Sequence, residues 1–298
     1  MTDFDKTLKR YHAMVQSSIG SFLPEENAAP RTILEAMAYS LLGTGKRVRA
    51  VLMLAFYEFC GGTETEKALP FAAALEMIHA YSLAHDDLPC MDNDDMRRGK
   101  ASSHIVFGEA NALLAGDGLL TLAFETMATP ENVAAFGAEK VLCAIKALAN
   151  AAGATGMVGG QVMDLENEGV EVSAEELINT DEKKTGALIC AAADIGCILA
   201  GGTDDIRNAA NEYAAKMGLA FQVVDDILDK IGDEATLGKP IGSDEEQEKS
   251  TYVTVYGLEK AQETAKHLTE EAVSAIGRVN GDSLFLCELV KFLCNRTY

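Results

Sequence analysis

A cluster of aspartates follows an apolar helical segment in the first third of the chain. The stretch Glu76 to Gly99, EMIHAYSLAHDDLPCMDNDDMRRG, holds five aspartates, and Asp86, Asp87 and Asp92 are its candidate metal ligands. A loop after Pro89 can return Asp92 toward Asp86. Close like charges raise each other's pKa or recruit a counter-ion, and carboxylate oxygens suit Mg²⁺ rather than zinc. The cluster predicts a magnesium site, with a solvated acidic loop as the alternative.

A second aspartate cluster lies much later in the chain, at the end of an apolar run. Asp225, Asp226 and Asp229 stand at i, i+1 and i+4, with Gln222 on the same side of the predicted helix Ala209 to Leu228. Carboxylates are unfavourable at a helix C-terminus, where the helix dipole is also negative, and a bound cation would remove that conflict. The spacing therefore predicts a second metal-binding face, with a solvated helix surface as the alternative.

Basic residues accompany both clusters. The run GTGKRVR places Lys46, Arg47 and Arg49 behind Gly45 and ahead of an apolar helix, where a bound anion would be favoured. Arg97 and Arg98 follow the first cluster, and arginine recognises phosphate oxygens in a bidentate manner. The alternatives are a basic surface turn and ordinary ion pairs with the aspartates.

Further polar residues interrupt apolar segments downstream. Paired glycines, Gly159 and Gly160, precede Gln161 and Asp164, and such glycines destabilise a helix unless close packing or a ligand requires them. Lys184 begins an apolar helical wall and is either a ligand contact or an exposed lysine. Lys239, Asp244 and Lys249 bring cations and a carboxylate together again after the second cluster.

Helices must position these groups. Phe71 to Leu83 has no helix breaker, so it predicts a buried helix that Pro89 ends, with His79, Ser82 and Asp86 on one stripe. Ser173 and Glu176 form a capping-box pattern. Other helices are expected at Asp5 to Ile19, Thr32 to Leu42, Ala110 to Met127, Asn132 to Gly153 and Leu258 to Tyr298. No long strand alternation occurs, so we expect an all-α, single-domain protein over residues 1–298.

Composition narrows the possible partners. The 298-residue chain is 48% hydrophobic and carries 46 acidic against 25 basic side chains, a net charge of −21. This charge argues against nucleic acid and anionic membranes, whereas a local basic cluster can still bind a small anion. The seven cysteines lack CxxC spacing, and we find neither a signal-peptide pattern nor an apolar stretch of about 20 residues. We expect a cytoplasmic protein with reduced thiols and no stable membrane insertion.

Seven ordered motifs, spread over essentially the whole chain, strongly resemble the short-chain trans-prenyltransferases, the polyprenyl synthase family, and most closely its bacterial-type farnesyl diphosphate synthases. They are GTGKRVR, HAYSLAHDDLPCMDNDDMRRGK, HIVFGEANALLAGD, GGQVMD, KKTGAL, FQVVDDILD and GKPIGSDEEQEKSTY. The resemblance implies an isoprenoid-synthase helical bundle around a central apolar cavity. It also implies a Mg²⁺-dependent head-to-tail condensation of isopentenyl diphosphate with an allylic diphosphate (dimethylallyl or geranyl), which releases pyrophosphate, and a homodimer.

The same resemblance assigns roles to the candidate residues. About three Mg²⁺ ions would bind with the substrate diphosphate, two at Asp86 and Asp92 and one at Asp225, with Asp87, Asp226, Asp229 and Asp244 nearby. Arg97, Lys184, Lys239 and Lys249 would hold the allylic diphosphate, and Gly45, Lys46, Arg49, His79, Arg98 and Phe221 the isopentenyl diphosphate. Thr185, Gln222 and the Lys184 carbonyl would present oxygen dipoles to the carbocation.

Product length is expected to depend on Tyr81, with small Ser82 beside it. Tyr81 lies five residues before Asp86, roughly 7.5 Å along a helix, and its ring would narrow the pocket floor. This favours a C15 product, farnesyl diphosphate, although DDLPCMDNDD also resembles the geranylgeranyl diphosphate synthases. A terpene cyclase would lack the basic isopentenyl site, and a non-catalytic helical subunit would have lost one aspartate cluster.

Overall fold

The computed structural model describes residues 2–170, 172–231 and 250–294, and its regular structure is almost entirely helical. The first helices are α1 (Asp3–Ser18), α2 (Arg31–Leu41), α3 (Val48–Phe59), α4 (Leu69–Asp86), α5 (Ser103–Phe107), α6 (Glu109–Met127), α7 (Pro130–Phe136) and α8 (Ala138–Ala152). They are followed by α9 (Met157–Glu166), α10 (Ala174–Asp181), the π-helical turn η3 (Glu182–Gly186), α11 (Ala187–Ala200), α12 (Asp204–Ile231), α15 (Tyr252–Tyr256), α16 (Leu258–Gly277) and α17 (Leu284–Cys294). Two 3₁₀ turns are η1 (Ile19–Phe22) and η2 (Thr65–Ala68). The predicted all-α class is confirmed.

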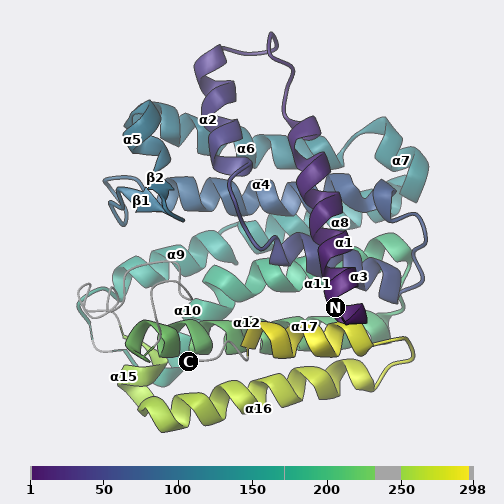
Figure 1. Cartoon of the computed structure of the whole chain (residues 1–298), viewed down its shortest axis with the longest axis vertical. Coiled ribbons are helices and arrows are strands. Elements are labelled where there is room, and N and C mark those ends of the chain that lie inside the picture. Colours follow the sequence, from purple (N-terminus) through teal and green to yellow (C-terminus); the bar gives the residue numbers. More distant parts are fainter. Residues whose placement is uncertain (1, 171, 232–249, 295–298) are drawn as a thin grey trace.

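The helices form a bundle in which α4 and α11 are central (Figure 1). Helix α4 packs against α6 and α3, while α11 packs against α3, α8 and α12, and α16 covers the other side of α12. Helices α1 and α2 cross the front of this bundle in the view of Figure 1. One continuous apolar core joins these elements.

Helix α4 is buried because its apolar residues surround the axis. Phe71 to Ile78 are all buried, which is the pattern of a helix inside a core rather than on a surface. The helix ends at Asp86, and the Asp92 N–H then donates to the Asp86 carbonyl at 2.9 Å. The predicted helix and the predicted return of Asp92 toward Asp86 are both confirmed.

Two local features differ from the sequence expectation. The single helix expected over Asn132 to Gly153 is two helices, α7 and α8, because Gly137 has φ +86 and interrupts the helical backbone. An unexpected hairpin pairs β1 (Met96–Arg97) with β2 (Lys100–Ala101). Its two turn residues, Arg98 and Gly99, both have positive φ, as tight two-residue hairpin turns require.

The later helices follow the sequence signals closely. Ser173 Oγ accepts from the Glu176 N–H at 3.3 Å while Glu176 accepts from the Ser173 N–H at 2.8 Å, so the expected capping box begins α10. The expected C-terminal helical region is divided into α16 and α17. The stretch Ala138–Glu166, which contains α8 and α9, is apolar and long enough to cross a membrane by length and composition alone. The core helix of a soluble protein passes the same test, so the absence of membrane insertion stays a prediction.

Candidate active site

The first aspartate cluster lies at the C-terminal end of α4. Burial, together with the neighbouring Asp92 and Asp87 charges, raises the pKa of Asp86 to about 6 against the opposing charges of Lys184 and Arg97. The Asp86 carboxylate is therefore an oxygen donor whose ionised form is unfavourable without a cation, and Asp92 lies beside it. This is the electrostatic situation that the sequence predicts for a metal site.

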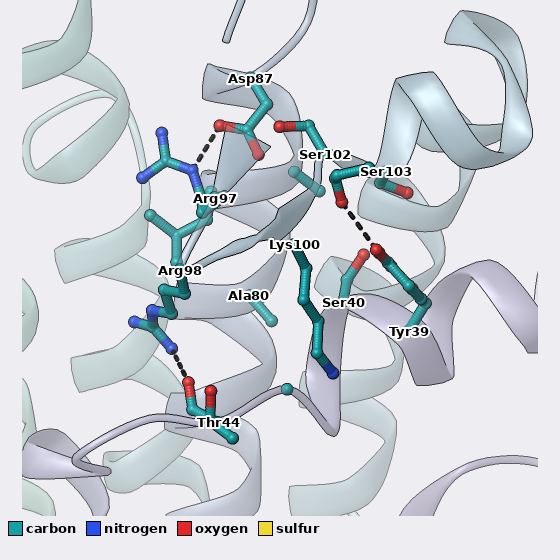
Figure 2. A pocket seen from close by; sticks show the side chains of 14 residues that line it. Tyr39, Ser40, Thr44, Ala80, Asp87, Arg97, Arg98, Lys100, Ser102 and Ser103 are labelled. Atoms are coloured by element: carbon teal, nitrogen blue, oxygen red, sulfur yellow. Dashed lines mark hydrogen bonds and ion pairs between the residues drawn. The ribbon is translucent and has the colours of Figure 1, made fainter. Parts of the chain in front are cut away.

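Asp87 is directed to the hairpin instead. Its carboxylate is buried and accepts a hydrogen bond from Arg97 Nε, as Figure 2 shows. Arg97 is also 3.5 Å from Asp94. The β1–β2 turn therefore holds Arg97 against the aspartate loop, and Asp87 positions this arginine. A direct role of Asp87 in metal binding stays a prediction.

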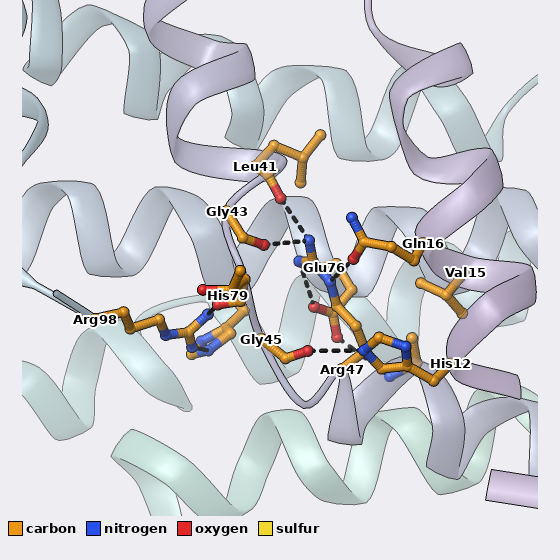
Figure 3. A network of polar contacts seen from close by, with 12 residues as sticks. His12, Val15, Gln16, Leu41, Gly43, Gly45, Arg47, Glu76, His79 and Arg98 are labelled. Carbon is orange, nitrogen blue, oxygen red and sulfur yellow. Dashed lines mark hydrogen bonds and ion pairs between the residues drawn. The ribbon is translucent and has the colours of Figure 1, made fainter. Parts of the chain in front are cut away.

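A basic cluster lies beside α4 at His79, about two helical turns before Asp86. Arg98 Nη1 donates to the Thr44 carbonyl at 3.0 Å, and Arg98 Nη2 lies 3.4 Å from His79 Nε2 (Figures 2 and 3). Arginine only donates, so His79 Nε2 is the acceptor. A Cβ on Gly45 would lie 2.6 Å from Arg98 Nη1, so glycine is what lets the chain approach the guanidinium. Three predicted isopentenyl diphosphate residues thus lie together.

Arg49 completes this cluster. Burial, reinforced by the Arg49 and Arg98 charges, holds the pKa of His79 well below its usual value, so the imidazole is neutral. Arg49 Nε is itself buried and finds no hydrogen-bond partner among the described residues. An unsatisfied guanidinium N–H is costly, and an anion at this position would satisfy it.

Arg47, the middle cation of the GTGKRVR run, has a structural role. It adopts φ 51, which turns its side chain inward to Glu76 at 3.1 Å and to the carbonyl oxygens of Leu41 and Gly43 at 2.9 Å each (Figure 3). Both charged side chains are buried. This ion pair fixes the loop that carries Gly45 and leads into α3, whose second residue is Arg49. Only the three-dimensional pairing reveals this role.

Lys184 lies between the two aspartate clusters. It occupies the π-helical turn η3 and pairs with Asp164 of α9 at 2.6 Å. The charges of Asp164, Asp86 and Asp92 raise the pKa of Lys184 against the opposing effect of burial. The predicted reason for paired glycines is confirmed here, because a Cβ on Gly160 would lie 2.6 Å from Lys184 Cα. Close packing of α9 on η3 therefore positions the lysine.

The second cluster opens onto a cavity of about 320 Å³. Asp225, Asp226, Gln222 and Lys184 line it, as does Asp181 at the end of α10. Asp226 accepts a hydrogen bond from the Tyr252 N–H at 2.7 Å, which anchors the first turn of α15. Asp229 is buried rather than lining this cavity. The structure thus brings Lys184, Gln222 and two of the three aspartates together.

The sequence does not predict the environment of two residues, Asp181 in this cavity and Gln161 on α9. Burial, together with the Asp164 charge, raises the pKa of Asp181 to about 7. Asp181 looks like an ordinary helix-end carboxylate in the sequence, so no signal indicates it. The sequence gives Gln161 no role beyond following the paired glycines, yet its Nε2 is buried with no hydrogen-bond partner among the described residues.

The remaining predicted residues occupy varied positions. Lys46 is exposed, whereas Thr185 and Phe221 are half-buried. Ser82 donates to the His79 carbonyl at 3.0 Å, and Tyr81 is buried with its ring centroid 5.6 Å from that of His85. Lys239, Asp244 and Lys249 lie outside the described residues, so their predicted roles stay predictions.

Comparisons with known proteins match this arrangement to one family. The polyprenyl synthetase family model matches residues 30–280. The chain belongs to the polyprenyl synthetase family. Its relatives include a geranylgeranyl diphosphate synthase of Cyanophora paradoxa, 43% identical over 95% of this chain and 93% of the relative. Another is the farnesyl diphosphate synthase of Bacillus subtilis (strain 168), 41% identical over 93% of both chains.

Structural comparison gives the same answer. An FPP/GFPP synthase from Zymomonas mobilis, solved in its apo form, superposes with a TM-score of 0.87 at 34% identity, over 98% of this chain and 99% of the other. The chain is therefore a prenyltransferase with the isoprenoid-synthase helical fold, as predicted. Relatives that make farnesyl and geranylgeranyl diphosphates are about equally similar, so product length is decided by neither comparison.

The donor set of this prenyltransferase fits Mg²⁺ bound together with substrate. Among residues 2–170, 172–231 and 250–294, no group of three or more acidic, histidine or cysteine side chains is already gathered as a metal cage. Mg²⁺ commonly binds through one or two carboxylates plus substrate phosphates and water. Asp86 with Asp92, and Asp225 across the site, supply carboxylates of that kind.

Proposed function

We propose that this prenyltransferase condenses isopentenyl diphosphate with dimethylallyl and geranyl diphosphates to give farnesyl diphosphate, and that the reaction requires Mg²⁺. The observation that carries this proposal is the separation of two anion-binding environments. The cluster of Arg49, His79 and Arg98 offers two guanidinium cations and a neutral imidazole, whereas Asp86 and Asp92 offer carboxylates near Lys184. The first suits a diphosphate bound directly, and the second suits a diphosphate bound through metal ions.

The chain's own residues account for the main steps. Lys184 exchanges its ion pair with Asp164 for oxygens of the allylic diphosphate, and Arg97, held on the hairpin by Asp87, binds the same group. Bound Mg²⁺ supplies positive charge that stabilises the departing pyrophosphate. Gln222 lines the same cavity as Lys184 and directs its side-chain oxygen to the allylic cation. The Thr185 hydroxyl and the Lys184 backbone carbonyl direct their oxygens to the same cation.

The second substrate is oriented by the basic cluster. Arg49 and Arg98 bind its diphosphate, neutral His79 contributes a hydrogen bond, and the isopentenyl double bond then attacks the allylic cation. Pyrophosphate accepts the proton that leaves the new allylic chain. His79 does not serve as the base in this scheme, because it is bound to Arg98 and lies within the basic cluster.

Product length is assigned to Tyr81. Its buried ring lies on α4 five residues before Asp86, roughly 7.5 Å along the helix axis. Burial and the Asp86 charge raise the pKa of Tyr81 to about 12, so the phenol stays neutral near the carboxylates. One helical turn deeper, Met77 and Ile78 are fully buried and form the next floor.

The test is mass-resolved product analysis of Tyr81→Ala and its matched control Tyr81→Phe. The Ala variant opens about one helical turn, roughly 5.4 Å, which approximates one isoprene unit. We expect mainly C15 product from wild type and Tyr81→Phe, and C20 or longer product from Tyr81→Ala. A wild type that makes mainly C20 product would support the geranylgeranyl alternative, the product named for the 43% identical relative.

We also propose a cytoplasmic homodimer. Apolar side chains are exposed on the neighbouring helices α5, α6 and α8, and include Ile105, Leu114 and Leu142. Light scattering after gel filtration tests the assembly. Leu114→Lys should give a monomer, whereas Leu284→Lys, on the distant α17, should leave a dimer. A monomeric wild type would refute the assignment.

A further inference from the structure

Two cysteines meet where α3 and α11 end. Figure 1 shows these helices packed together in the middle of the bundle. Cys60 is the residue that follows α3, and Cys197 lies in the last turn of α11. A Cβ on Gly202 would lie 3.0 Å from Cys60 Sγ and 3.3 Å from Cys197 Cβ, so both cysteine side chains pack against this glycine. The two thiols are also close enough to interact with each other.

The helices around this pair are held in close contact. A Cβ on Gly196 would lie 2.9 Å from Phe56 Cβ, so α11 touches α3 within one turn of the cysteines. The Gly202 N–H donates to the Cys197 carbonyl at 2.8 Å, which fixes the turn after α11. Both cysteines therefore stand on backbone that close packing and a turn hydrogen bond hold in place.

The two thiols differ in accessibility and acidity. Cys60 is half-buried, whereas Cys197 is fully buried. The hydrogen bond from the Cys197 thiol lowers the pKa of Cys60, and the same contact with burial raises the pKa of Cys197. Cys60 is thus the thiol that a small reagent meets first, and Cys197 is placed to react second.

We propose that Cys60 and Cys197 form a reversible disulfide by exchange with a low-molecular-weight disulfide such as oxidised glutathione. The Cys60 thiolate attacks one sulfur of that disulfide and releases one thiolate, which leaves a mixed disulfide on Cys60. Cys197 loses its proton to that thiolate or to water and attacks Cys60 Sγ, which releases the second thiol. The protein loses two electrons and two protons, and one disulfide becomes two thiols.

The disulfide would link two helices of the bundle at a distance from the candidate active site. Cys60 lies eleven residues after Arg49, roughly 16 Å along the helix, and Cys197 lies thirteen after Lys184, roughly 20 Å. The disulfide would join the C-terminal ends of α3 and α11, whereas Arg49 and Lys184 lie at or just before the N-terminal ends of these helices. We therefore expect increased stability with unchanged catalytic activity.

The experiment oxidises the full-length protein with oxidised glutathione, alkylates remaining thiols and maps the peptides by mass spectrometry. Wild type should lose both thiols together and yield a Cys60–Cys197 linked peptide. Its thermal midpoint should rise by roughly 4 to 8 °C and return with dithiothreitol. Cys143→Ala, at an exposed position on α8, should behave as wild type.

The Cys197→Ala variant separates the two chemical steps. It should stop at a stable glutathione adduct on Cys60, with circular dichroism confirming its fold. Alkylation of both Cys60 and Cys197 in oxidised wild type would overturn the proposal. So would linkage of Cys60 to a different cysteine, or an equal yield of the linked peptide from urea-unfolded chain, because either would show that the fold does not pair these two thiols.

Discussion

The buried pair of Arg47 and Glu76 makes Glu76→Gln the most informative stability variant. The two side chains are 4% and 3% exposed and lie 3.1 Å apart. Glu76 also accepts a hydrogen bond from the Ala50 N–H at 3.3 Å. Neutralising Glu76 leaves a buried guanidinium without its counter-charge, which destabilises proteins by about 3–5 kcal/mol. We expect the lower end of that range, because glutamine keeps the shape and Arg47 keeps two carbonyl acceptors.

The exposed pair of Arg31 and Glu35 provides a matched control. It has the same residue types at 2.7 Å, but its side chains are 88% and 50% exposed. Urea unfolding should show about 3 kcal/mol lost in Glu76→Gln and within about 0.5 kcal/mol in Glu35→Gln. The KM for isopentenyl diphosphate should also rise in Glu76→Gln alone, because the loop that leads into the start of α3, where Arg49 lies, loosens. Equal unfolding free energies for the two variants would refute the reasoning.

Two further variants test the surroundings of Lys184. Gly160→Ala forces a Cβ against the Lys184 backbone, so we expect a loss of about 1–3 kcal/mol in urea unfolding and a lower kcat, whereas Gly277→Ala, with open space around it, should be neutral or slightly stabilising. Asp181 has a folded-state pKa of about 7, above its ordinary 3.8, so its contribution to the stability of metal-free protein decreases as pH rises from about 4 to 7. Asp181→Asn should therefore gain about 2–3 kcal/mol of stability relative to wild type as the pH rises from 5 to 7.5, and a pH-independent difference in unfolding free energy would contradict this.

The fold and much of the site were accessible from the sequence because they depend on local patterns. An apolar run without breakers defined α4, and helical spacing placed His79 and Asp86 on it. Pro89 and the short loop made the approach of Asp92 to Asp86 predictable. The paired glycines likewise indicated a close packing contact before its partner was known.

Other features depend on pairing between distant segments, which one sequence does not display. Arg47 shares its motif with Lys46 and Arg49, yet its left-handed backbone turns it inward to Glu76. Asp181 acquires its raised pKa from burial beside Asp164, 17 residues away in the sequence. The hairpin turn at Arg98 was missed because strands of two residues have no alternation to detect.

The most direct test of the account is mass-resolved product analysis of the purified wild-type protein. It should be incubated with isopentenyl diphosphate and either dimethylallyl or geranyl diphosphate, in Mg²⁺ and in excess chelator. The account predicts a longer prenyl diphosphate and released pyrophosphate in Mg²⁺, neither in chelator, and full recovery when Mg²⁺ is restored. Condensation that continues undiminished in chelator, or no prenyl product from either allylic diphosphate in Mg²⁺, would contradict it.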